Sequence, residues 1–189
     1  MKDVLISTQP KWVAKICNEI GKRADGTPVY EKEIEVRKTR PKQEVPFRCF
    51  IYATKSGDRI TIKGDKVFEI SKELTGKVIG EFICNEVKYI HPAYGYLDAR
   101  CEGGSGYILD KCCLTSKQLI EYGKGKDLYA WHISNLVIYD KPKELSEFLI
   151  DCKNCNKKFV GDTNCWQGCV NGYRRLTRPP QSWCYVEEV

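Results

Sequence analysis

The sequence predicts an α+β fold, mainly β, in which a small, partly closed β-barrel carries flanking helices. Segments with strand-like patterns outnumber those with helical patterns, and no glycine-rich phosphate loop follows any strand. The second observation argues against a nucleotide-binding α/β sheet. The chain has 189 residues, of which 42% are hydrophobic, and this is enough for one well-buried domain.

The first predicted elements are a short strand over residues 3–7 and an amphipathic helix that Gly21 ends. Ser7 or Thr8 can cap this helix, and Pro10 suits its first turn. Its apolar face has residues at spacings of three and four: Trp12, Val13, Ile16, Cys17 and Ile20.

Alternation with period two predicts a strand within residues 29–42, and a β-rich run follows over 46–55. We expect these two to form a hairpin or to be neighbours. Further strands are expected at 58–62, 66–70, 77–90 and 129–140. Two short helices are expected at 115–123, capped by Thr115 or Ser116, and at 143–150, entered through Pro142.

Charge and composition bound the function only loosely. Lys and Arg number 31 against 25 Asp and Glu, a net charge of +6 that favours polyanionic partners. No apolar run approaches the ~20 residues that a membrane span needs, and the first ten residues are too quickly interrupted for a signal peptide. We therefore expect a cytoplasmic protein. Its 11 cysteines are then metal ligands or small buried side chains.

The segment 151–182 contains two short-spaced cysteine pairs. Cys152 and Cys155 are separated by two residues and Cys165 and Cys169 by three, a spacing that suits a structural tetrahedral Zn²⁺. The alternatives are four unligated thiols, or one pair completed by Cys112 or Cys113. The segment also carries four of the six net positive charges, which could contact phosphates or serve solubility.

Residues 183–189 follow a double proline and are rich in β-formers, so we expect a last strand that closes the barrel. The domain organisation that follows has three parts. Residues 1–150 form the barrel, residues 151–182 form a cysteine-rich zinc-knuckle insertion, and residues 183–189 form the closing strand of the barrel.

The stretch "EKEIEVRKTRPK" sets three charged residues on alternate positions, with Ile34 and Val36 between them. If the apolar pair points inward, Glu33, Glu35 and Arg37 share the opposite face. A carboxylate beside a guanidinium suits the edge of a nucleobase. The alternative is a surface ion ladder, worth ~0 to 1 kcal/mol per pair. Phosphate could be held from the strand's ends by the nearby cations Lys32, Lys38, Arg40 and Lys42.

Five segments in order resemble the ASCH family of the PUA-like superfamily: "LISTQPKWVAKI", "EKEIEVRKTRPK", "PFRCFIYATK", "GKVIGEFICNEV" and "LYAWHISNLVIYDKP". The resemblance spans about residues 4–142, and "RPPQSWCYVEE" is similar to the ending of ASCH proteins from phages and Gram-positive bacteria. It implies a PUA-like barrel whose cleft, beside the first helix and the E-x-R strand, binds RNA or a nucleotide. The ligand-binding residues expected in this cleft are Lys32, Glu33, Glu35, Arg37, Lys38, Arg40, Trp131 and His132.

Aromatic side chains could stack on splayed bases in such a cleft. The candidates are Trp12, Tyr52, Tyr94, Tyr96, Trp131 and Trp183, most of which are expected in the core.

The resemblance also raises an enzymatic alternative, because some ASCH proteins deacetylate N4-acetylcytidine with a lysine and a threonine of this strand motif. The lysine matches Lys32, but Glu35 stands where the threonine falls. Lys32 and Glu35 would be the catalytic groups of a hydrolase or a ribonuclease. We favour a binding module over an enzyme. A third alternative is a phage-type protein that sequesters a host factor or counters host defence.

Overall fold

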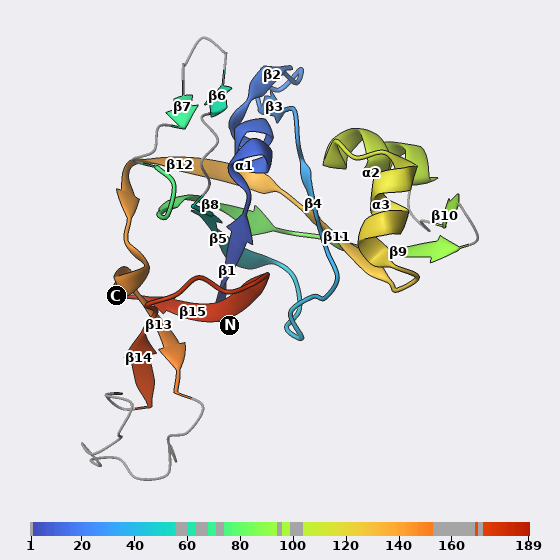
Figure 1. Ribbon diagram of the computed structural model, residues 1–189. Coiled ribbons are helices and arrows are strands. Elements are labelled where there is room, and N and C mark those ends of the chain that lie inside the picture. The colour runs from blue at the N-terminus through green and yellow to red at the C-terminus, as the bar shows by residue number, and fades with distance from the viewer. Residues whose placement is uncertain are drawn as a thin grey trace.

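Figure 1 shows the computed structural model, which describes residues 2–55, 60–62, 68–70, 74–93, 96–98, 104–152, 169 and 172–189. The fold is mainly β, as predicted, and the described residues include three α-helices. The helices are α1 (Pro10–Cys17), α2 (Gly104–Cys112) and α3 (Ser116–Gly123). In the described part of the chain, no helix is long and apolar enough to cross a membrane.

Most strands belong to two sheets. The seven-stranded sheet has the order β12 (Ser134–Lys143), β8 (Val78–Cys84), β5 (Phe47–Ala53), β1 (Asp3–Thr8), β15 (Trp183–Glu188), β13 (Phe148–Asp151) and β14 (Tyr173–Arg175). The four-stranded sheet has the order β10 (Tyr96–Asp98), β9 (Val87–Ala93), β11 (Leu128–His132) and β4 (Ile34–Arg37). Two small hairpins pair β2 (Glu19–Lys22) with β3 (Pro28–Tyr30) and β6 (Ile60–Ile62) with β7 (Phe68–Ile70).

The chain passes between the two sheets at Ile133, between β11 and β12. Among the described strands, neither of these two sheets closes on itself or pairs with the other through hydrogen bonds, so they form no closed barrel. The last strand, β15, pairs with β1 on one side and with β13 on the other. The N- and C-terminal ends of the chain therefore lie side by side in the middle of the larger sheet.

Three apolar clusters hold these layers together. Alternate residues of β1 and β5 point to opposite faces of the larger sheet. On one face, Val4 and Ile51 pack with α1. On the other face, Leu5 and Phe50 pack with Phe148. The third cluster joins the smaller sheet to α2 and α3, which lie beside β4, β9 and β11 in Figure 1. It contains both apolar residues of the E-x-R strand, Ile34 and Val36.

Several predicted elements are correct. Thr115 caps α3 through a capping box, and Pro10 lies in the first turn of α1. The strands expected at 58–62 and 66–70 are present in their described parts as β6 and β7. The run 77–90 divides into β8 and most of β9.

The predicted helix over 143–150 is wrong. Lys143 still belongs to β12, a 3₁₀ turn covers Leu145–Glu147, and Phe148 then starts a strand that pairs with β14 and β15. Burial of Phe148 against Phe50 decides this outcome, because a ring contact across the sheet outweighs weak local helix propensity.

Three further predictions near the N-terminus and centre need correction. Helix α1 ends at Cys17, and Ile20 lies exposed in β2. Gln9 is its N-cap residue, whereas Ser7 and Thr8 belong to β1. The strands β4 and β5 do not pair, because β4 pairs with β11 and β5 pairs with β1 and β8. Helix α2 was not predicted.

Candidate functional site

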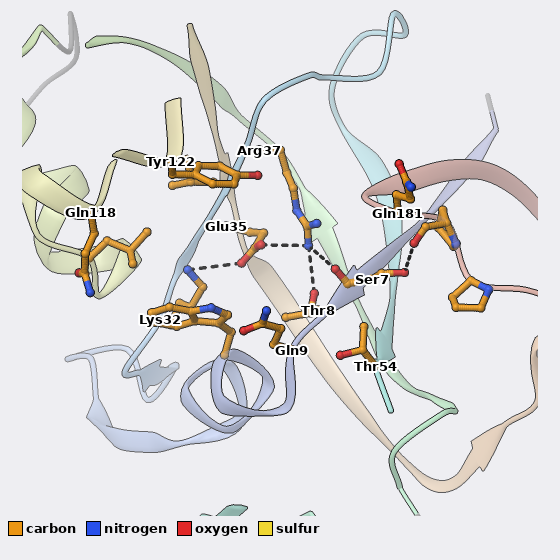
Figure 2. Close-up of a pocket in the computed structure, with 15 residues that line it drawn as sticks. Ser7, Thr8, Gln9, Lys32, Glu35, Arg37, Thr54, Gln118, Tyr122 and Gln181 are labelled. Atoms are coloured by element: carbon orange, nitrogen blue, oxygen red, sulfur yellow. Dashed lines mark hydrogen bonds and ion pairs between the residues drawn. The ribbon is translucent and has the colours of Figure 1, made fainter. Parts of the chain in front are cut away.

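A cavity of about 580 Å³ lies where β1, α1, β4, α3 and the segment before β15 meet. We call it the central cavity. Figure 2 shows that its polar side chains converge from both sheets and from α3. Its lining consists of Ser7, Thr8, Gln9, Trp12, Lys32, Glu35, Val36, Arg37, Thr54, Leu114, Gln118, Tyr122, Pro179, Pro180 and Gln181.

Three buried charged side chains, from β4 and the residues just before it, form one wall of the cavity. Glu35 Oε1 lies 2.9 Å from Arg37 Nη2, and Glu35 Oε2 lies 3.3 Å from Lys32 Nζ. All three residues are classed as buried, so the surface ion ladder considered above is not what β4 forms. We call Lys32, Glu35 and Arg37 the buried triad.

Arg37 also ties the cavity wall to β1 and to the start of β15. Its Nη2 donates to the backbone oxygen of Ser7 at 3.0 Å and to Thr8 Oγ1 at 3.1 Å, and its Nη1 donates to the backbone oxygen of Ser182 at 3.2 Å. Among the described residues, its buried Nε has no hydrogen-bond partner. Arg37 therefore supports the fold by joining β4 to β1 and to the start of β15.

Lys32 reaches the cavity because it precedes the strand. Its backbone N–H donates to the oxygen of Lys15 at 3.0 Å, so α1 holds this segment before β4 begins. Its Nζ donates to the backbone oxygens of Ile34 at 2.7 Å and Cys112 at 3.0 Å. The Glu35 carboxylate, at 3.3 Å, completes an ion pair with this ammonium group.

Polar and aromatic side chains at the cavity mouth are less constrained. Tyr122 of α3 lies above Glu35 in Figure 2, and Lys38 Nζ lies 4.8 Å from its ring centroid. Burial raises the pKa of Tyr122, so its hydroxyl stays protonated at neutral pH. Within the described part of the chain, the side-chain amides of Gln9 and Gln181 make no hydrogen bond. These groups are available to a ligand.

The predicted site residue Glu33 does not line the central cavity. Its carboxylate lies 2.6 Å from Arg23 Nη2 and 3.0 Å from Lys111 Nζ. Burial opposes ionisation of Glu33, but these two cations outweigh it and lower its pKa. The expected alternation therefore fails at the start of β4, where Lys32 takes the place predicted for Glu33.

The remaining predicted residues are dispersed. Lys38 is exposed and adjoins the cavity only through Tyr122, whereas Arg40 is exposed and does not line it. Trp131 is fully buried in the core, where its ring meets those of Phe47 and Trp183, so it cannot stack on a ligand in this structure.

His132 also lies away from the central cavity. Its Nδ1 is 2.8 Å from Asn85 Oδ1, and burial lowers its pKa. Both observations describe a structural histidine. Of the other aromatic candidates, Trp12 lines the cavity, and the side chains of Tyr94 and Tyr96 lie outside the described residues.

The sequence did not reveal the neutral part of the cavity. These residues come from four separate segments, and only Gln118 and Tyr122, four residues apart on α3, share a helical spacing; the set is Gln9, Thr54, Gln118, Tyr122 and Gln181. The double proline before β15 was the one local signal, because Pro180 accepts from Ser7 Oγ at 2.6 Å and thereby fixes the position of Gln181.

The predicted zinc ligands are only partly described. Cys152 and Cys169 are buried, and Cys155 and Cys165 lie outside the described residues. The alternative partners Cys112 and Cys113 lie at the end of α2, on the opposite side of Figure 1 from β13 and β14. Burial raises the pKa of both of these thiols, which disfavours a metal-binding thiolate.

No family model matches the sequence, and no curated protein matches it. Solved structures of an ASCH protein from Zymomonas mobilis do match over nearly the whole chain. Two single-residue variants give TM-scores of 0.52 at 15% identity, covering 99% and 98% of this chain and 91% and 89% of theirs. The unsubstituted protein gives 0.51 at 15%, covering 98% of this chain and 88% of its own. The chain therefore has the ASCH-family fold.

Proposed function

We propose that this protein binds single-stranded RNA or a modified nucleotide in the central cavity. The observation that carries the proposal is the buried triad, which fixes a carboxylate in a cavity large enough for a nucleotide-sized ligand. Pockets for small ligands measure roughly 300–1,000 Å³, and this one measures about 580 Å³. The ASCH fold, which suggests nucleic-acid binding in general, is consistent with this proposal.

The triad supplies a hydrogen-bond acceptor for a base edge. One cation lies beside each oxygen of the Glu35 carboxylate, and the carboxylate retains lone pairs for a ligand N–H. The free amides of Gln9 and Gln181 can complete recognition at the mouth, because each offers a donor and an acceptor.

Tyr122 supplies the stacking surface in this proposal. Its side chain is 39% exposed, and among the described residues its one ring contact is with the Lys38 ammonium group. Stacking of a base on an aromatic side chain is worth about 1–3 kcal/mol. A Tyr122→Ala change should therefore weaken binding about 5- to 150-fold while leaving the core unchanged.

The test is the anisotropy of a fluorescein-labelled random-sequence single-stranded RNA, titrated with wild-type protein and variants at two salt concentrations. Tyr89→Ala is the matched control, because Tyr89 is exposed on β9 and lines no part of the central cavity. Salt-sensitive binding that Tyr122→Ala weakens and Tyr89→Ala preserves would support the proposal. Equal affinity in both variants would refute it.

A charge reversal at Arg37 is a poor test of the site. The Arg37→Glu change would place a second buried carboxylate beside Glu35 and remove the donors to Ser7 and Ser182. Loss of binding could then reflect loss of folding. Gln9→Ala is the better polar variant, because the Gln9 side chain is exposed and makes no described hydrogen bond.

The contacts of the triad weigh against the hydrolase alternative. Lys32 Nζ donates to two backbone oxygens and lies 3.3 Å from Glu35, so its ammonium group is engaged with the fold. Both oxygens of the Glu35 carboxylate are likewise engaged in ion pairs. Running each binding sample on a denaturing gel distinguishes the two functions, since shortened RNA would identify a nuclease.

We also propose that Cys152, Cys155, Cys165 and Cys169 hold one structural Zn²⁺. The supporting observation is the hairpin of β13 and β14, in which the Cys152 N–H donates to the oxygen of Gly172 at 2.8 Å. This pairing draws together the two ends of the chain segment that carries the cysteines. Four thiolates would satisfy the ion and leave no open position for catalysis.

Native mass spectrometry before and after chelation tests the zinc proposal. One zinc ion should be lost on chelation, and Cys152→Ser should prevent binding. Cys184→Ser is the control, because Cys184 is half-buried in β15 and outside the cysteine-rich segment. A metal-free mass for the wild-type protein would refute the proposal.

A further inference from the structure

We propose that a second cavity extends the site, so that the ligand is a phosphodiester-linked strand and not a free nucleotide. This inference rests on the proposed function of the central cavity. The second cavity measures about 630 Å³ and lies between the end of β5, the 3₁₀ turn at Leu145–Glu147 and the segment that follows β14. We call it the side cavity.

The two cavities share walls. Thr54 and Pro179 line both of them. Hydrogen bonds hold these walls against β1. The Thr54 N–H donates to the backbone oxygen of Thr8 at 2.9 Å, and Ser7 Oγ donates to the backbone oxygen of Pro180 at 2.6 Å. The two cavities are therefore adjacent, and in this proposal the ligand runs from one to the other past Thr54.

Each cavity has the size of a site for one small ligand, roughly 300–1,000 Å³. A free nucleotide in the central cavity would leave the side cavity of about 630 Å³ unused. Two consecutive nucleotides of one strand would occupy both cavities. The arrangement thus favours a strand over a monomer.

Lys55 provides the side cavity with a cation for phosphate. It is exposed, and it makes no ion pair with any residue that the structure describes. The aliphatic part of the Lys55 side chain passes over Gly76, where a Cβ atom added to the glycine would lie 2.7 Å from Lys55 Cε. Gly76 has a φ of +87° that glycine adopts readily, and this conformation lets the lysine stem lie close to the backbone.

The acidic residue of the side cavity does not oppose a phosphate strongly. The Glu144 carboxylate is 2.9 Å from Lys77 Nζ, which compensates its charge. Thr54, Ser146 and Thr177 add hydroxyl groups that can donate to phosphate or ribose oxygens. One unpaired ammonium group among neutral donors suits a single phosphodiester.

Competition against a labelled random-sequence 12-nucleotide RNA tests this inference. The unlabelled competitors are a mixture of the four ribonucleoside monophosphates, random dinucleotides and random tetranucleotides. We expect tetranucleotides to compete at least about tenfold better than monophosphates. Lys55→Ala should reduce that advantage, leave competition by monophosphates unchanged, and lower the salt slope for the 12-nucleotide RNA by about 0.7, the value for one phosphate contact.

Lys22→Ala is the matched control, because Lys22 is exposed on β2 and lines neither cavity. Equal competition by all lengths would overturn the inference and leave the central cavity as a nucleotide site. A length advantage that Lys55→Ala reduces no more than Lys22→Ala does would also overturn it. If no RNA binds, the single-stranded RNA form of the proposed function fails, and this inference fails with it.

Discussion

Removal of the Glu35 carboxylate should be among the most destabilising single changes in this chain. Glu35 lies between Arg37 Nη2 at 2.9 Å and Lys32 Nζ at 3.3 Å, and the three side chains are 9%, 8% and 2% exposed, respectively. A Glu35→Ala change leaves two cations together where water hardly reaches them. Removing one partner of a buried ion pair costs about 3–5 kcal/mol of unfolding free energy, and we expect this magnitude here.

Glu33 offers a matched comparison. Its side chain is 6% exposed and also bridges two cations, but those of Arg23 and Lys111 are 44% and 24% exposed. After Glu33→Ala, both cations can turn into solvent. The expected cost is therefore that of lost charged hydrogen bonds, about 1.5–3 kcal/mol.

Urea denaturation followed by circular dichroism measures both changes. Glu35→Ala should have the lower midpoint at an unchanged slope with urea concentration. The double change Lys32→Met with Glu35→Ala should recover part of the loss, because one buried cation remains where the single variant has two. Equal midpoints for the two single variants, or a lower midpoint for Glu33→Ala, would refute the reasoning.

Three further predictions concern pH, strand packing and helix capping. Burial lowers the pKa of His132 below 6.5. The unfolded chain therefore binds the proton first, and stability should fall as pH drops from about 6.5 through the folded-state pKa. In pH-dependent melting curves, His132→Asn should remove this slope and His91→Asn should retain it. Gly80→Ala should cost about 1–3 kcal/mol in urea denaturation, because its Cβ would lie 2.4 Å from a backbone oxygen of β12. Gly106→Ala in α2, which meets nothing within 4 Å, should cost nothing. Thr115→Ala removes the α3 cap and should lower stability by about 1 kcal/mol in thermal melts. Equal stabilities for the two glycine variants, or an unchanged melt for the cap variant, would contradict the structure.

The sequence predicted the elements whose signals are local. Thr115 and the apolar spacing behind it are enough to start α3. The run 129–140 was predicted as a strand and contains most of β11 and of β12, and the residues after the double proline do form the strand β15. In these cases the residues that decide the structure lie within one or two turns of one another, so propensity and pattern agree with the final contacts.

Elements that depend on distant partners were predicted less well. The segment 143–150 has helical spacing, but from Phe148 onward it forms β13, which pairs with β14 and β15 more than 20 residues away. The family resemblance placed Trp131 among the ligand contacts, and the packing of Phe47 and Trp183 buries it instead.

The sequence by itself determined the chemistry that β4 can offer, because period-two alternation puts Glu35 and Arg37 on the face opposite Ile34 and Val36. The resemblance added the family, and the fold agrees. Only the tertiary structure decided which groups meet there. Lys32, and not Glu33, lines the central cavity, because hydrogen bonds to α1 and α2 hold these two residues just before the strand begins. Packing also brings Tyr122, Gln9 and Gln181 to the same cavity. Contacts between segments far apart in the chain have no local spacing, so they follow from packing and not from sequence pattern.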